Sequence, residues 1–284
     1  MTGDLIFQVV TWTASDNEDD EEYQIVVFGR TQDHKSVSVR ISFKPYFYVA
    51  IPSYLNHSEV RTFVDRIKDK VGKEYKETLE RHAVVTRKKF YGYTANKDFK
   101  FVRLVFNTFE GMTKWKWTAM RNHEVFEANF DPMLRFAHVQ NIKSAGWIKI
   151  DDGNWSESAS ELHNVDIEAV VDDYKNVKPH DNESIAPLVQ ASFDIETYSD
   201  EGFPDATRPT NECIQISTTL QRFGEPEPYK KHLLTLKKCN PIEGVEVVSF
   251  DTEKEVLEAW TQLIKDEGVD MLIGYNIWGF DLNY

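Results

Sequence analysis

Hydrophobic and polar residues alternate along most of the first 43 residues. The stretches LIFQVVTW (5–12), YQIVVFG (23–29) and SVSVRISF (36–43) each place apolar residues at every second position, the period of a half-buried β-strand. Short polar segments separate them, so we predict an antiparallel β-meander. The acidic run from Asp16 to Glu22 falls at the first reversal and is predicted to be a solvated hairpin loop.

Residues 46–128 show a mixed pattern that changes between the strand and the helix period. The sequence predicts a strand at 46–51, a helix from Ser58 to Val71, strands at 83–93 and 98–106, a helix at 109–121 and a short strand at VFEAN. This βαββαβ order is the ferredoxin-like pattern, which RNA-recognition modules share.

The strand FKFVRLVF within this region carries two aromatic rings, Phe99 and Phe101, on one side. Such rings either stack on nucleic-acid bases or pack the sheet against its helices. The glycine of the aromatic RNA-binding signature is absent, which favours packing.

A second α/β region follows a polar stretch. Residues 151–186 are acidic and rich in Ser and Asn, and they are predicted to be a linker with one strand at VDIEAVV. Strands are then predicted at 188–198, 213–220, 232–236, 245–250 and 270–276, with a helix at 253–266. Thr252 and Glu255 form a capping box at the start of this helix. Its predicted apolar stripe comprises Val256, Leu257, Trp260, Leu263 and Ile264.

The expected fold is therefore α/β and α+β, in three segments. Residues 1–150 form an N-terminal domain with the meander and the ferredoxin-like part, residues 151–186 are the linker, and residues 187–284 begin a ribonuclease-H-like core. A length of 284 residues agrees with about two domains.

Charge is distributed unevenly along the chain. The net charge is −14, yet residues 81–121 contain ten Lys and Arg against Asp98 and Glu110. Aromatic residues are interleaved with these cations, a composition typical of a nucleic-acid groove. The basic residues proposed for nucleic-acid binding are Arg87, Lys88, Lys89, Lys100 and Arg103.

Two distant cysteines, Cys213 and Cys239, argue against a disulfide scaffold and a zinc finger. No apolar run has the length of a membrane span, and the first residues lack the pattern of a signal peptide. We expect a soluble intracellular protein without a membrane partner.

Two carboxylates, Asp194 and Glu196, lie in the apolar stretch VQASFDIET, which otherwise reads as a buried strand. Residues two apart in a strand point to one face, so both acids share a face with Ser192. Such a pair suits Mg²⁺, and two Mg²⁺ ions are a standard device for phosphodiester cleavage. The alternative is a solvated face with two incidental acids.

A third carboxylate, Asp281, follows the last predicted strand in LIGYNIWGFDLNY. It is either a further metal ligand or an ordinary aspartate that caps a helix. Asn276, at the end of the same strand, could donate to a phosphate or a base without adding charge.

Three segments together resemble the first two exonuclease motifs of family B DNA polymerases: SFDIET, CIQIS and GYNIWGFDLNY. Their sequences are most similar to those of the delta type. The segments IAPLVQASFDIE, FKPYFYVAIP and DPMLRFAHVQNIKSAGWIKI extend the resemblance upstream. The meander that starts within the first few residues is most similar to that of delta-like polymerases of large DNA viruses.

The resemblance implies a 3′–5′ proofreading site in which Asp194, Glu196 and Asp281 bind two Mg²⁺ ions, with Mn²⁺ as an alternative ion. It also implies that Asn276 positions the substrate and that Phe280 packs beside it. The implied partners are the DNA primer end and template, the rest of the polymerase or a second chain, and a sliding clamp. The implied location is the host nucleus or a viral replication compartment.

The third exonuclease motif, Tyr-x-x-x-Asp, and the polymerase segments have no counterpart before Tyr284. We therefore expect a fragment or one part of a split polymerase, with little nuclease activity on its own. The competing hypothesis is a non-catalytic nucleic-acid-binding module that binds through residues 81–121.

Overall fold

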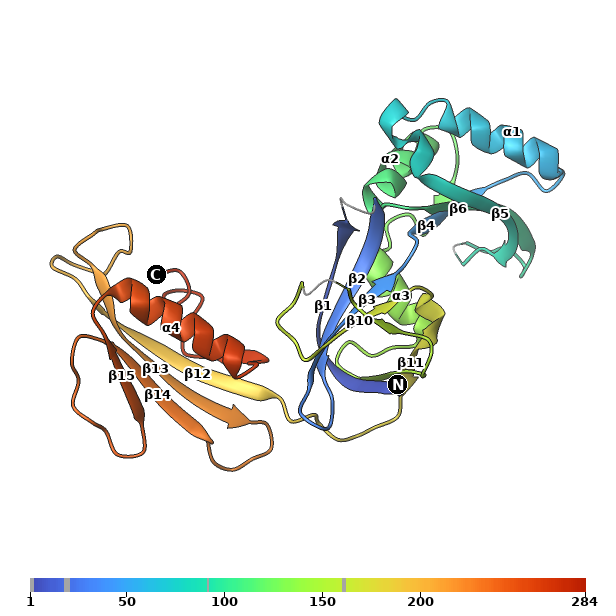
Figure 1. Ribbon diagram of the computed structural model, residues 1–284. Coiled ribbons are helices and arrows are strands. Elements are labelled where there is room, and N and C mark those ends of the chain that lie inside the picture. The colour runs from blue at the N-terminus through green and yellow to red at the C-terminus, as the bar shows by residue number, and fades with distance from the viewer. Residues whose placement is uncertain (1–2, 18–20, 91, 160–161) are drawn as a thin grey trace. The chain divides into compact units, whose positions relative to one another are not determined.

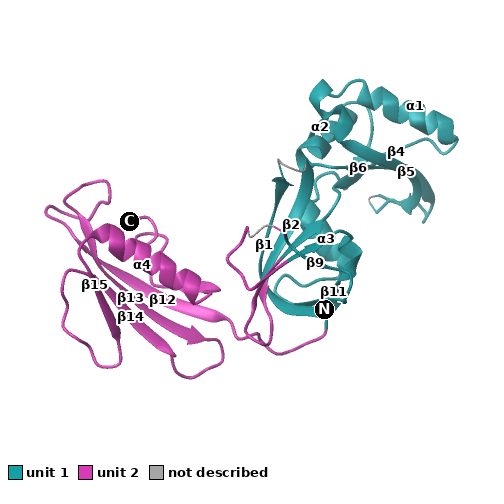
Figure 2. Cartoon of the chain, in the orientation of Figure 1, with its two compact units in different colours: residues 1–28, 39–158, 169–180 teal, residues 29–38, 159–168, 181–284 magenta. Residues whose placement is uncertain are grey.

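The computed structural model describes residues 3–17, 21–90, 92–159 and 162–284, which form two compact units (Figures 1 and 2). Unit 1 contains residues 1–28, 39–158 and 169–180, and unit 2 contains residues 29–38, 159–168 and 181–284. Both units are discontinuous in sequence, so their boundaries differ from the predicted divisions at 150 and 186. None of the helices in the described ranges is long and apolar enough to cross a membrane.

The predicted meander is present as three consecutive strands of a seven-stranded sheet with the order β11-β8-β1-β2-β3-β10-β9. Every second residue of β1 is buried from Leu5 to Val9, as the sequence pattern predicts. The bounds are β1 Leu5–Asn17, β2 Glu22–Arg30, β3 Ser36–Ser42, β8 Trp147–Ile150, β9 Ser156–Glu157, β10 Ile167–Val171 and β11 Val177–His180. Helix α3 spans Pro132–Gln140.

The acidic run between β1 and β2 is only partly a free loop. Residues 18–20 lie outside the described part of the chain. Asp16 instead accepts hydrogen bonds from the backbone N–H groups of Phe109 (2.6 Å) and Glu110 (2.9 Å), at the start of helix α2 (Phe109–Met120). This carboxylate therefore stabilises a helix N-terminus, where unpaired N–H groups and the helix dipole favour a negative charge.

The segment expected to be a linker contributes strands to the first sheet. Strand β10 comprises the last five residues of the predicted VDIEAVV strand, and β11 pairs antiparallel with β8 through Val177–Ile150 and Lys178–Lys149. The strands β9 and β11 were not predicted because they are only two and four residues long, too short to show a hydrophobic period.

Residues 46–126 follow the predicted order of elements, βαββαβ, and their four strands are arranged as β5-β6-β4-β7. Phe47, Leu104, Phe106 and Trp115 form part of the core that the sheet shares with its helices. The bounds are β4 Tyr46–Ala50, α1 His57–Lys68, the 3₁₀ helix η1 Lys73–Thr78, β5 Leu79–Lys88, β6 Asp98–Phe106, α2 Phe109–Met120 and β7 Val125–Phe126. Helix α1 thus ends before Val71, and β5 ends before residue 93.

The two rings of β6 lie on the face of the sheet opposite this core. Phe101 is buried and packs edge-on against Tyr48 and Phe126, with ring centroids 6.5 and 5.2 Å apart. The ring of Phe99 lies beneath the ammonium of Lys89. Packing is therefore the role of Phe101.

Unit 2 is built on a five-stranded sheet with the order β15-β14-β13-β12-β16. Strand β12 lies between β13, with which it pairs antiparallel, and β16, with which it pairs parallel. Helix α4 starts at the predicted capping box and packs on one face through Trp260, whose ring lies 4.9 Å from that of Phe193. The bounds are β12 Val189–Tyr198, β13 Glu212–Arg222, β14 Lys230–Leu236, β15 Glu246–Phe250, α4 Glu253–Asp266 and β16 Met271–Ile273.

The apolar stripe of α4 is narrower than predicted. Val256 is fully buried, whereas the following residue, Leu257, is 45% exposed. Successive residues are about 100° apart around a helix, so Leu257 is turned away from the packed face.

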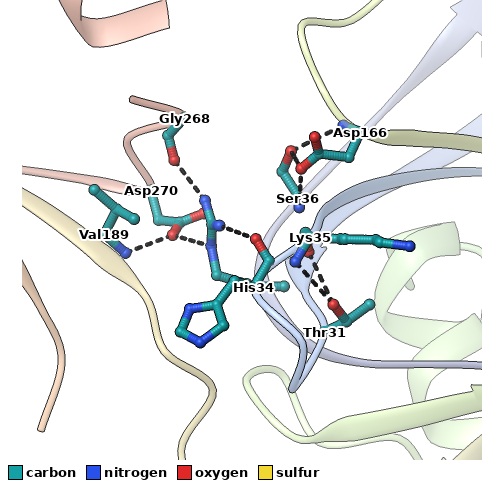
Figure 3. A network of polar contacts seen from close by, with 9 residues as sticks. Thr31, His34, Lys35, Ser36, Asp166, Val189, Gly268 and Asp270 are labelled. Carbon is teal, nitrogen blue, oxygen red and sulfur yellow. Dashed lines mark hydrogen bonds and ion pairs between the residues drawn. The ribbon is translucent and has the colours of Figure 1, made fainter. Parts of the chain in front are cut away.

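An ion pair with little solvent exposure anchors the start of β12 (Figure 3). Arg30, at the tip of the β2–β3 hairpin, donates from Nε to Asp270 Oδ2 over 2.5 Å, and the two side chains are 5% and 9% exposed. The other guanidinium nitrogens donate to the carbonyl oxygens of His34 and Gly268. Asp270 Oδ2 also accepts from the N–H of Val189, the first residue of β12, over 2.7 Å.

Neighbouring contacts hold the same hairpin tip. Asp166 accepts from the backbone N–H and the hydroxyl of Ser36 over 2.7 and 2.8 Å, and its own N–H donates to the Ser36 hydroxyl (Figure 3). Residues 29–38 are therefore bonded into unit 2 by both side chains and backbone.

Burial raises the pKa of the Asp270 carboxyl in spite of the adjacent Arg30 guanidinium, which acts in the opposite direction. Removal of either partner would leave the other charge buried without compensation, which typically costs about 3–5 kcal/mol.

We predict that Asp270→Ala lowers the free energy of opening of β12 and β16 by about 3 kcal/mol, because Arg30 and the Val189 N–H both lose their acceptor. Hydrogen exchange of peptides from these strands measures the change. The matched control is Glu258→Ala, which removes an exposed pair with Lys254 and should change exchange by less than about 0.5 kcal/mol. Equal effects of the two substitutions would contradict the anchoring role.

Candidate active site

Asp194 and Glu196 project from the exposed face of β12, and Phe193 is buried on the opposite face with α4. The shared face is as predicted, but neither carboxylate is buried, because α4 covers only the other side of the strand. The pairing of β12 with β13 shifts register between Glu196 and Thr197. Such bulges often lie beside active sites, where they change the direction of a side chain.

Asp281 reaches the strand that carries the other two acids. Its Oδ1 accepts a hydrogen bond from the backbone N–H of Ile195, the residue between Asp194 and Glu196, over 3.2 Å. The parallel pairing of β12 with β16 ends at Ser192–Ile273. Beyond this pair, the Asp281 side chain accepts the backbone hydrogen bond that a further residue of β16 would otherwise accept.

Gly274 allows the chain after β16 to stay close to β12. A Cβ atom at this position would lie 2.9 Å from the carbonyl oxygen of Phe193 and 2.2 Å from Cγ2 of Ile277. Both distances are too short for a real Cβ contact, so this close approach requires glycine. Gly274 thus allows the segment that carries Asp281 to lie against β12.

Asn276 and Phe280 lie on the turns between β16 and Asp281. Asn276 adopts a left-handed conformation (φ 57°), and its carbonyl accepts from the N–H groups of Gly279 and Phe280. The ring of Phe280 packs against Phe203 and Tyr284, with centroids 5.3 and 5.9 Å away. These contacts place the two residues next to Asp281 and leave their roles toward a substrate as predictions.

The donor chemistry of the three acids suits a hard divalent cation, since carboxylate oxygens are the ligands that Mg²⁺ prefers. Asp281 is hydrogen-bonded within one residue of both Asp194 and Glu196 along β12. Even so, no three His, Cys, Asp or Glu side chains of the described ranges are grouped closely enough to hold a metal ion. The structure brings the three acids to the same strand without grouping them into a closed coordination shell.

A cavity of about 210 Å³ adjoins Asp281 on the α4 side of the sheet. Its lining includes Cys213, whose N–H donates to Glu253 over 2.7 Å. Burial and the nearby Glu253 carboxylate raise the pKa of the Cys213 thiol to about 11. This thiol is therefore neutral and a poor nucleophile at physiological pH.

The five basic residues proposed for nucleic-acid binding all belong to β5, β6 or the loop that joins them, and most have partners within unit 1. Lys88 pairs with Asp98 and Lys89 pairs with Glu124, while Lys100 donates to the Ser53 carbonyl. Arg103 stacks 5.5 Å above the ring of Tyr46, and the guanidinium of Arg87 donates to the carbonyl of Thr86. Four of the five thus have structural contacts beyond their immediate chain neighbours.

Sequence reasoning missed Arg30 and Asp270, which position β12. The two residues are 240 positions apart, and neither lies in a recognisable motif. The only local signal was Asp270 directly before an apolar strand, a position where a buried acid needs a partner.

Comparison with known proteins decides the family. The family model described as DNA polymerase family B, exonuclease domain, matches residues 123–284, more than half of the chain. The chain belongs to the family B DNA polymerases. The matched range contains β12, β16 and all three carboxylates of the candidate site.

Viral DNA polymerases and DNA polymerase delta catalytic subunits are among the relatives. The DNA polymerase of Paramecium bursaria Chlorella virus NY2A is 34% identical over 99% of this chain, and that of Acanthamoeba polyphaga mimivirus is 34% identical over 98%. The DNA polymerase delta catalytic subunit of Arabidopsis thaliana is 29% identical over 92%. The predicted likeness to delta-like polymerases of large DNA viruses is confirmed.

The chain spans only 30%, 18% and 25% of the lengths of these three relatives. The solved structure of the family B DNA polymerase from the hyperthermophilic archaeon Pyrobaculum calidifontis has a similar fold, with a TM-score of 0.68 and 19% identity. That match covers 99% of this chain and 31% of the archaeal one.

We predict that iodoacetamide modifies Cys239 much faster than Cys213 in the folded chain at pH 8, because a thiol with a pKa of about 11 is almost entirely protonated there. The rate at Cys213 should rise as the pH approaches 11, and denaturation should remove the difference between the cysteines. Mass spectrometry of the labelled peptides measures both rates. Rapid labelling of Cys213 in the folded chain at pH 8 would refute the prediction.

Proposed function

We propose that this chain is the N-terminal region of a replicative DNA-directed DNA polymerase, together with the first part of its 3′–5′ proofreading exonuclease. The observation that carries the proposal is the hydrogen bond from the Ile195 N–H to Asp281. This bond joins the acids of the first and second exonuclease motifs at one strand, although they are more than 80 residues apart in the sequence.

In this proposal Asp194, Glu196 and Asp281 bind the divalent cations, and Asn276 and Phe280 position the substrate. Two bound Mg²⁺ ions, or Mn²⁺ in their place, would activate a water and stabilise charge on the phosphate. The exposed face of β12 leaves Asp194 and Glu196 accessible to a DNA 3′ end. Asp281 fixes the edge of the strand through Ile195 and so helps to hold both acids in place.

The proposed architecture is a ferredoxin-like subdomain at residues 46–126 and the beginning of a ribonuclease-H-like exonuclease domain at residues 187–284. The strand order β5-β6-β4-β7 supports the first assignment, and the antiparallel β12–β13–β14 unit with β16 parallel to β12 supports the second. The proposed partners are primer and template DNA, the remaining polymerase polypeptide and a sliding clamp. The proposed place of action is a nucleus or a viral replication compartment.

Residues 1–284 contain three of the four carboxylates of the family's exonuclease motifs, namely Asp194, Glu196 and Asp281. The fourth would be the aspartate of the third motif, Tyr-x-x-x-Asp. We therefore propose that these residues, expressed by themselves, have little nuclease activity.

A non-catalytic nucleic-acid-binding module remains the second candidate function. Residues 81–121 favour it, because they contain ten Lys and Arg and only two acidic residues. The two functions differ in their dependence on metal, since only the exonuclease needs the carboxylates of β12.

We predict that Mg²⁺ or Mn²⁺ raises the melting temperature of the wild-type chain and not that of an Asp194→Ala/Glu196→Ala variant. At ten times the dissociation constant a ligand stabilises by about 1.4 kcal/mol, which corresponds to roughly 2–4 °C. Differential scanning fluorimetry with and without EDTA measures the shift. The matched control is Glu225→Ala/Glu227→Ala, which removes two acids from the loop after β13 and should keep the shift.

We also predict that residues 1–284 do not trim a mismatched primer from its 3′ end in Mg²⁺, because the set of metal ligands is incomplete. A gel assay with a labelled primer and template measures this activity. Efficient metal-dependent trimming by wild type that disappears in Asp194→Ala would refute the proposed inactivity, while it would support the assignment of Asp194.

A further inference from the structure

The loop between β5 and β6 presents two aromatic rings to solvent. Phe90 and Tyr93 are 105% and 97% exposed, more than any other large hydrophobic side chain in the described ranges. Full exposure of an aromatic ring is unfavourable, because its large apolar surface stays in contact with water. Two such rings three positions apart in one loop indicate a surface that binds a partner.

The loop belongs to the most basic part of the chain. Residues 87–97 contain four Lys and Arg and no acidic residue, whereas the whole chain carries a net charge of −14. Asp98 pairs with Lys88, and Glu124 pairs with Lys89. Arg87 and Lys97 are exposed, and within the described residues neither has a carboxylate partner at ion-pair distance.

The base of the loop is held in a defined conformation. The Lys88 ammonium donates to the carbonyl of Asn96 over 2.7 Å, and the Lys97 N–H donates to the carbonyl of Thr94 over 3.0 Å. Lys89 lies over the rings of Phe99 and Phe126, 5.1 Å from each centroid. The rings of Phe90 and Tyr93 are therefore displayed from a loop anchored on both sides, which reduces the entropy lost on binding.

The loop curls to the side of the four-stranded sheet opposite helix α1 (Figure 1). This is the side on which Phe99 and Phe101 lie. The loop therefore lies on the side of the sheet where Lys89 covers the ring of Phe99.

We propose that the β5–β6 loop binds single-stranded nucleic acid, with Phe90 and Tyr93 stacking on bases and Arg87 and Lys97 contacting phosphates. Stacking rings next to cations are the usual means by which proteins bind single strands without sequence preference. The choice of nucleic acid as the partner rests on the proposed function. The binding surface itself lies in unit 1 and does not include the carboxylates of β12. An anionic membrane surface could also attract cations and rings, so it is one arm of the test.

The test measures binding of a fluorescein-labelled oligo(dT) to the full 284-residue chain by fluorescence anisotropy. We expect Phe90→Ala/Tyr93→Ala to weaken binding at least tenfold, because each stacked base contributes substantially to affinity. The matched control is Tyr54→Ala, which removes an aromatic side chain that is 79% exposed elsewhere in unit 1 and should change binding less than about twofold. All three side chains are exposed, so the variants should keep the circular dichroism and melting temperature of wild type.

The charge contacts have a separate signature. We expect Arg87→Gln/Lys97→Gln to reduce the slope of log affinity against log salt by about 1.4, that is, about 0.7 for each lost phosphate contact. Phe90→Ala/Tyr93→Ala should leave this slope unchanged, because the rings release no counterions.

Wild-type affinity in Phe90→Ala/Tyr93→Ala would overturn the proposal. So would a wild-type chain that binds vesicles of phosphatidylserine and phosphatidylcholine but not the oligonucleotide. The metal-free Asp194→Ala/Glu196→Ala variant should still bind the oligonucleotide. A wild-type chain that binds the oligonucleotide but whose melting temperature does not respond to Mg²⁺ would therefore count against the exonuclease assignment alone.

Discussion

The buried ion pair between Arg30 and Asp270 is the interaction on which unit 2 depends. Asp270 serves two partners at once, the guanidinium of a distant hairpin and the first N–H of β12. The backbone N–H of Asp270 returns a hydrogen bond to the carbonyl of Val189, so β12 and β16 are aligned from their first residues. The N-terminal hairpin tip is therefore an integral part of the fold that carries the candidate site, although it lies far from that site in sequence.

The backbone of the sheet then fixes the positions of the acids. Strand β12 pairs with β16 as far as Ser192 and with β13 past both acids, which sets the direction of Asp194 and Glu196 without any help from their own side chains. Where β16 ends, Gly274 permits a close approach and Asp281 caps the remaining N–H of Ile195. Backbone pairing, one glycine and one carboxylate thus position the groups that the proposed chemistry would use.

Much of this could be predicted from the sequence, because the signals are local. The period of two in Val37–Phe43, the capping box at Thr252 and the shared face of Asp194 and Glu196 all depend on residues a few positions apart, and all are present. In the segment 151–186 the sequence predicts β10, whereas β9 and β11 are too short to show a period and depend on pairing with other strands. The exposure of the acids and the pairing of Arg30 with Asp270 depend on which distant segments cover a face, and periodicity carries no information about that.

The exposure of Asp194 and Glu196 has a consequence for inheritance. Substitutions at exposed positions away from networks and caps change stability little, so a chain that lost these acids would fold normally and escape chaperones and proteases. Under the proposed function, such a lesion would leave a polymerase at normal abundance that copies with more errors. Because the acids are exposed on β12, chaperones and proteases would thus not remove polymerase variants that lack them and copy with more errors.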